Sequence, residues 1–143
     1  MAIIESELKM TDLIDVESLQ KIQDAFSDMS GIASMITDAS GTIQTKPSGF
    51  TDFCKIYVRN TEEGRKRCEL CDKLGVERAA KAGGSCAYFC HAGLVEFAAP
   101  IMAHGHLVGC FIGGQMLTIP PDEEELRHVA EEIGVDADGL VRA

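Results

Sequence analysis

The chain has 143 residues, of which 45% are hydrophobic and 25% charged, which is the size and balance of one globular domain. This composition excludes disordered and collagen-like proteins, and no apolar run reaches the roughly 18 residues of a membrane-spanning helix. The net charge of −10 has the wrong sign for binding a nucleic acid backbone. Because residues 1–10 also lack a signal-peptide pattern, we expect a cytoplasmic domain that contacts neither nucleic acid nor membrane.

The acidic residues gather at the two ends of the chain. Residues 1–30 carry a net charge of −5 and residues 121–143 carry −6, whereas residues 31–120 carry +1. The nearly neutral centre also holds all of the cysteines, which are Cys54, Cys68, Cys71, Cys86, Cys90 and Cys110. In a reducing compartment such a set favours metal binding, redox chemistry or buried thiols over disulfides. We therefore expect the functional chemistry in the centre.

The first predicted element is a helix over residues 15–31, with Asp15 as its N-cap and Gly31 as its end. Residues 32–37 and 42–45 are predicted as a β-hairpin, in which Gly41 supplies the positive φ of the turn. The helix has an apolar stripe with heptad-like spacing, which predicts core packing and also suits a homodimer; its members are Leu19, Ile22, Phe26 and Met29.

The second half of the chain alternates between helices and strands. A short helix is predicted over residues 53–58 and a long one from Thr61 to the glycine pair 83–84. Strands are predicted over residues 85–90, 94–101 and 107–113, followed by a helix from Pro121 to Gly134. The fold class is therefore α+β, with a five-stranded antiparallel sheet, helices over one face and terminal helices. The domain is expected to span residues 15–134, with 1–14 and 135–143 as flexible tails.

Residues 19–117 carry motifs that resemble the PocR sensory domain family. These motifs are Ile36-Thr37-Asp38 with Gly41, Phe53-Cys54, Arg67-Cys68, Cys90-His91-Ala92-Gly93-Leu94, Phe97-Ala98-Ala99-Pro100-Ile101 and Gly114-Gln115. The resemblance implies a PAS-like module that binds a small molecule, with short diols and other simple hydrocarbon derivatives as the associated ligands. It also implies an output domain in the full-length chain, either a histidine kinase or a DNA-binding regulator.

The spacing of the cysteines suggests one metal site. Cys68 and Cys71 share a helix face, with Cβ atoms about 5–6 Å apart, so both thiolates could reach one ion. Cys86 and Cys90 would stand about 13 Å apart on an extended strand, so one ion cannot take both. The resemblance favours Cys90 as the strand ligand. The predicted set is Cys54, Cys68, Cys71 and Cys90, which suits zinc or an iron–sulfur cluster; the alternative is that several of these thiols are core residues.

A pocket over the sheet would be lined by aromatic and polar side chains, and the candidates are Tyr57, Tyr88, Phe97, Phe111 and Gln115. Each of them could instead belong to the ordinary core. His91 follows a candidate metal ligand, and we expect it to hydrogen-bond the ligand, with metal ligation or a plain strand end as alternatives.

The sequence therefore predicts a sensory ligand-binding module of a signal-transduction or transcription-regulating protein. The alternative is a redox sensor based on a metal or an iron–sulfur cluster at the four cysteines. An enzyme is not expected, because Cys90 and His91, the adjacent nucleophile and base, would point to opposite faces of a strand.

Overall fold

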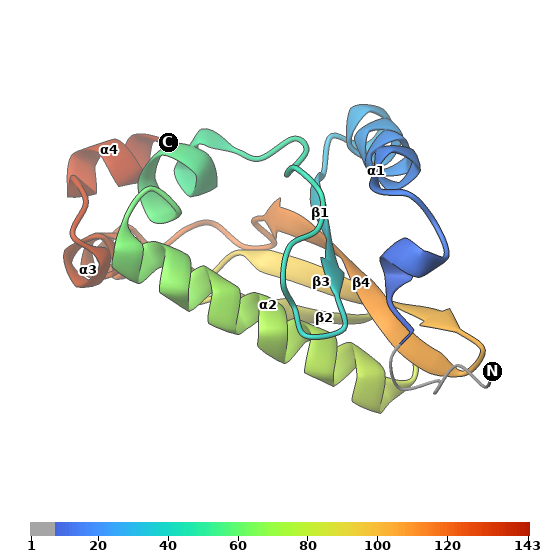
Figure 1. Ribbon diagram of the computed structural model, residues 1–143. Helices are drawn as coiled ribbons and strands as arrows, with labels where there is room; N and C mark the ends of the chain where they lie inside the picture. Colours follow the sequence, from blue (N-terminus) through green and yellow to red (C-terminus); the bar gives the residue numbers. More distant parts are fainter. Residues whose placement is uncertain (1–7) are drawn as a thin grey trace.

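The computed structural model describes residues 8–143, which form an α+β domain around a four-stranded antiparallel sheet (Figure 1). The strands are β1 (Ala33–Asp38), β2 (Cys86–Phe89), β3 (Val95–Ala103) and β4 (His106–Met116), in the order β1-β4-β3-β2. The helices are η2 (Met10–Asp12), α1 (Val16–Ser30), η3 (Phe53–Val58), α2 (Glu62–Ala82), α3 (Glu123–Ile133) and α4 (Ala137–Arg142). None of the helices in residues 8–143 combines the length and apolar character needed to cross a bilayer.

The predicted helix boundaries are confirmed by their caps. The Asp15 side chain accepts a hydrogen bond from the Ser18 N–H at the start of α1, and Gly31 ends that helix with a φ of 70°. The Thr61 side chain caps α2 in the same way, and Gly83 ends α2 in the left-handed conformation. Local chemistry therefore sets where these helices begin and end.

The predicted fifth strand, residues 42–45, is not formed in the described chain, so the five-stranded sheet is a wrong prediction. The turn is as expected, with Gly41 at a φ of 89°. The segment after it runs beside β1, but the Ile36 N–H donates to the Thr45 hydroxyl instead of to a backbone carbonyl. Only the isolated bridges Thr37–Ile43 and Ser34–Ser48 join this segment to β1. A side-chain acceptor has thus replaced part of the backbone ladder.

The helices pack on both faces of the sheet, the internal helix α2 on one face and the N-terminal helix α1 on the other. Cys110 and Ile112 of β4 pack with Val76 and Ala79 of α2 in one core cluster. Phe111, between them in the sequence, points to the opposite face and contacts Phe26 of α1, with ring centroids 5.0 Å apart. The sheet therefore lies between α2 and α1, and α2 runs across its front in Figure 1.

The C-terminal residues 135–143, expected to be a flexible tail, contain a helix and a buried side chain. They form α4, and Leu140 of this helix is fully buried with Phe53, Ala130 and Ile133. This apolar anchor explains why the segment folds onto η3 and α3, at the left end of the molecule in Figure 1. In the N-terminal segment, Met10 is buried, while residues 1–7 lie outside the described residues.

Candidate ligand-binding site

A cluster of charged side chains lies between α2 and the sheet. Asp72 sits on the buried stripe of α2 and is only 1% exposed. Its Oδ2 atom accepts from Arg59 Nη2 at 3.1 Å, and Arg59 follows directly after η3. The guanidinium also lies over the Phe50 ring, 5.3 Å from its centroid, which adds a cation–π contact. The ion pair therefore links η3 to α2 within the interior.

Two further polar residues enter the cluster from the sheet. Tyr88 of β2 and Glu96 of β3 are direct partners in the antiparallel register. Tyr88 packs with Val76 and Ala79 of α2, so its side chain points to the α2 face. Gly75 permits this packing, because a Cβ atom there would lie 2.3 Å from the Tyr88 hydroxyl. A glycine on α2 thus lets the phenol reach the helix backbone.

Burial changes the ionisation of both carboxyl groups. Desolvation, reinforced by the charge of Asp72, raises the pKa of Glu96 to about 7 against the attraction of Arg59. Desolvation likewise raises the pKa of Asp72 to about 6 against the attraction of Arg59. A buried carboxyl that is only partly ionised near neutral pH can act as donor or acceptor of a hydrogen bond.

Buried polar atoms without a partner mark this cluster. Among the described residues, four buried side-chain atoms have no hydrogen bond, and three of them are Asp72 Oδ1, Tyr88 Oη and Glu96 Oε2. Native proteins rarely leave such groups unsatisfied, because each costs about 1–3 kcal/mol. Three of these groups lie in one cluster, which makes the cluster a candidate for a ligand site.

A small cavity adjoins Glu96 and Arg59. Its volume is about 10 Å³, and its lining residues are Ala33, Met35, Phe50, Arg59, Glu96, Ile112, Gly113, Gly114 and Gln115. Such a volume suits about one water molecule and is too small for an organic ligand. The site is therefore nearly closed in this conformation.

The predicted metal ligands gather only in part. Cys54, Cys68 and Cys90 pack in one cluster, and Cys68 Sγ lies 3.3 Å from His91 Nε2. Burial raises the pKa of Cys54 and of Cys68 to about 12 and that of Cys90 to about 11, so these thiols stay protonated. Within residues 8–143 no group of three or more His, Cys, Asp or Glu side chains is arranged to hold a metal ion.

The predicted ligand-binding residues lie in different places. Tyr88 belongs to the charged cluster, and Gln115 lines the cavity. Phe97 and Phe111 stack on the other sheet face, against Phe26 of α1. Tyr57 packs in the cluster of η3, α3 and α4. His91 contacts Cys68, and its Nδ1 atom is the fourth buried atom without a partner. The structure therefore does not assemble these six residues into one pocket.

Sequence reasoning missed Arg59, Asp72 and Glu96. The sequence does contain a sign of Asp72 and Glu96, because each acid interrupts an apolar pattern. Asp72 interrupts the small and apolar side of α2 that continues with Gly75 and Val76. Glu96 likewise interrupts the apolar run of β3. Buried acids are rarely tolerated without a partner or a function. No comparable signal identifies Arg59, because its partner is brought near only by the fold.

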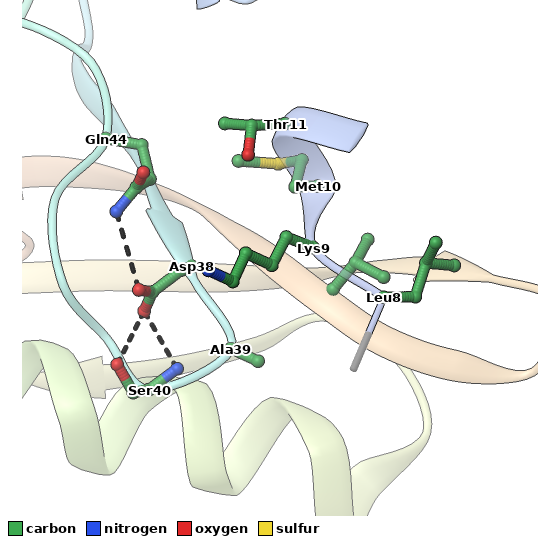
Figure 2. A pocket seen from close by; sticks show the side chains of 9 residues that line it. Leu8, Lys9, Met10, Thr11, Asp38, Ala39, Ser40 and Gln44 are labelled. Atoms are coloured by element: carbon green, nitrogen blue, oxygen red, sulfur yellow. Dashed lines mark hydrogen bonds between the residues drawn. The ribbon is translucent and has the colours of Figure 1, made fainter. Parts of the chain in front are cut away.

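A larger surface hollow of about 890 Å³ lies near η2 and the turn after β1 (Figure 2). Its acidic side chain, Asp38, is already engaged by that turn. The carboxylate accepts from the N–H and hydroxyl of Ser40 and from the N–H of Thr42. This hollow therefore has the polar groups of a structural turn, and we do not assign a ligand to it.

Buried polar atoms without partners beside a cavity make this part of the α+β domain a candidate binding site. The comparison with protein families identifies the domain. Residues 12–143 match the family described as the sensory domain found in PocR, so the chain belongs to the PocR sensory domain family. The Regulatory protein PocR of Salmonella typhimurium (strain LT2) is 33% identical over 103 residues. This match covers 72% of the chain but 34% of that protein, so the chain spans about a third of its relative's length.

Proposed function

We propose that the domain is the ligand-sensing part of a regulatory protein and that its ligand is a small, uncharged molecule with two hydroxyl groups. The observation that carries this proposal is the set of three buried atoms without partners, Asp72 Oδ1, Tyr88 Oη and Glu96 Oε2. Two hydroxyl groups of a diol can donate to the carboxyl oxygens, and one of them can accept from the tyrosine. The association of the family with short diols supports the same ligand class.

The charges of the cluster favour a neutral ligand over an anion. Arg59 is the cation of the cluster, and it is already paired with Asp72. An anionic ligand would add negative charge beside Asp72 and Glu96, whose pKa values desolvation already raises in this buried place. A hydroxyl ligand instead satisfies the orphaned atoms without bringing a charge out of water.

A ligand can bind only if the cavity opens, and this opening is the conformational change that the domain would transmit. A cavity of about 10 Å³ has to expand before a diol fits, which separates the sheet from α2 or from the residues around η3. Since η3 packs against α4, such a movement would reach the C-terminal helix. The ligand then favours the open arrangement over the closed one, and an output domain in a longer chain would respond to this change in population.

Titration with short diols tests the proposed ligand class. We expect propane-1,2-diol, propane-1,3-diol or ethane-1,2-diol to bind in isothermal titration, and lactate, which carries a carboxylate, to bind at least tenfold more weakly. Tyr88→Phe should weaken diol binding about tenfold, because one hydrogen bond to the ligand is lost. Tyr57→Phe is the matched control, since it removes the hydroxyl of the other tyrosine of the chain. Equal losses in both variants, or no diol binding at all, would contradict the proposal.

A metal or iron–sulfur cluster at the cysteines is a second candidate, favoured by one specific observation. Cys68 lies against His91, and Cys54 and Cys90 pack in the same cluster. Burial raises the pKa of the Cys71 and Cys90 thiols, and backbone N–H groups oppose this rise, that of His91 at Cys71 and those of Ala92 and Leu94 at Cys90. Such N–H groups stabilise thiolates. Metal binding would require the side chains to rearrange, since they are not arranged as a metal site.

Elemental analysis and a visible spectrum of protein purified without oxygen test this candidate. One equivalent of zinc, or iron with sulfide in brown protein, is the expected result. Cys68→Ser and Cys90→Ser should each abolish the bound metal, whereas Cys86→Ser should retain it, because Cys86 lies outside the cluster that holds Cys68 and Cys90. Metal-free wild-type protein that also fails to bind added Cd²⁺ would exclude a metal at these thiols.

A further inference from the structure

Gln115 occupies a β-bulge at the end of β4. The register pairs Val95 with Met116 but Glu96 with Gly114, so Gln115 has no partner on β3. Its φ of 61° is unusual for a residue with a side chain. Gly114 makes the bulge possible, since it has a φ of 148° and a Cβ atom there would lie 2.5 Å from the Val95 carbonyl oxygen. Bulges of this kind redirect a side chain, and strained residues concentrate at functional sites.

The redirected side chain separates two compartments. On one side, Gln115 lines the small cavity together with Glu96 and Arg59. On the other side, it lines a mainly apolar pocket of about 270 Å³, whose other residues are Thr51, Phe53, Leu94, Leu117, Pro121, Leu126, Leu140, Val141 and Ala143. Gln115 Oε1 accepts from the Thr51 N–H at 2.9 Å and from the Thr51 hydroxyl at 3.0 Å. These two hydrogen bonds hold the Gln115 side chain in place between the two compartments.

We propose that the apolar pocket is a second compartment of the ligand site and that it holds an alkyl chain attached to the hydroxyl-bearing head. This inference rests on the proposed function, because the head is placed at Asp72, Tyr88 and Glu96. Release of the Gln115–Thr51 hydrogen bonds would join the two compartments. The ligand is therefore an amphiphilic diol, and the pocket has room for an alkyl chain of about four to six carbon atoms.

The pocket also explains how the ligand would reach the C-terminal helix. Leu140 and Val141 of α4 line the pocket, and Leu126 of α3 lies beside them. An alkyl chain in this place would contact α4 directly, so the length of the chain would affect both affinity and the position of α4. A ligand without an alkyl chain would act only through η3.

A homologous series of alkane-1,2-diols tests this inference in isothermal titration. From propane-1,2-diol to about hexane-1,2-diol, affinity should rise about fourfold for each added methylene, the gain for transferring that group out of water. Leu117→Trp should fill the pocket, so that affinity no longer rises with chain length. Leu117 suits this test because its side chain is 55% exposed, so the variant should still fold.

Ile119→Trp is the matched control. Ile119 is an exposed apolar residue two positions further on, and it lines a neighbouring hollow but not the apolar pocket. It should leave the whole series unchanged. If propane-1,2-diol binds but affinity does not depend on chain length, or Leu117→Trp does not alter the dependence, the second compartment is refuted and the diol site stands. If no diol binds to the wild-type protein, the proposed function and this inference fail together.

Discussion

Replacing Glu96 with glutamine is expected to stabilise the domain at pH 8, relative to the wild type, by about 3 kcal/mol more than at pH 4.5. The reason is the pKa of Glu96, which burial raises to about 7 in the folded protein from an ordinary value of 4.5. The folded state therefore holds this proton more tightly than the unfolded state. The stability that this proton contributes to the folded state is fully present below pH 4.5 and is lost as the pH rises toward 7. Glutamine resembles the protonated acid in shape and does not titrate.

Urea denaturation at pH 4.5, 6 and 8 measures this difference. Glu63→Gln is the control of opposite sign, because hydrogen bonding to Arg67 lowers the pKa of Glu63, and its contribution to stability is lost as the pH falls. Parallel stability curves for the wild type and Glu96→Gln would show that Glu96 ionises freely in the folded protein. Such a result would remove the buried acid from the candidate site.

Replacing Arg59 with methionine should cost about 3 kcal/mol of unfolding free energy at pH 8. The side chain of its partner Asp72 is 1% exposed, so the substitution leaves a buried carboxylate without a counter-ion. The loss should be smaller at pH 5, because the pKa of Asp72, about 6 beside Arg59, rises further once the cation is gone and the group becomes neutral. Adding Asp72→Asn should recover more than half of the loss at pH 8.

Arg67→Met is the matched control for the buried pair. Arg67 pairs with Glu63 and Glu132, but these are ion pairs at the surface, which usually contribute less than about 1 kcal/mol. Chemical denaturation of the three single variants and of the double variant gives the coupling energy between Arg59 and Asp72. If Arg59→Met costs no more than Arg67→Met, the interior ion pair does not hold η3 to α2.

Helix α1 shows where an apolar sequence pattern predicts burial correctly and where it does not. The predicted stripe was Leu19, Ile22, Phe26 and Met29, and Leu19 is indeed buried. Ile22 and Met29, however, are 58% and 83% exposed, while Gln23 is fully buried. Gln23 hydrogen-bonds the Lys46 carbonyl, and Ser27 bonds Ser34. Polar partners from distant residues turned the helix away from its most apolar face, and periodicity carries no information on such partners.

The sequence determined the local features of this protein. Asp15, Thr61 and the glycines at positions 31, 83 and 134 set helix boundaries, because a cap forms with residues at most a few positions away. The sequence motifs also determined the family. The tertiary structure decided which side chains meet: it brought Arg59 to Asp72, paired Tyr88 with Glu96, and placed Phe97 on the other face. These contacts join residues from separate elements, and whether a buried charge finds its partner depends on how those elements pack, which local sequence does not specify.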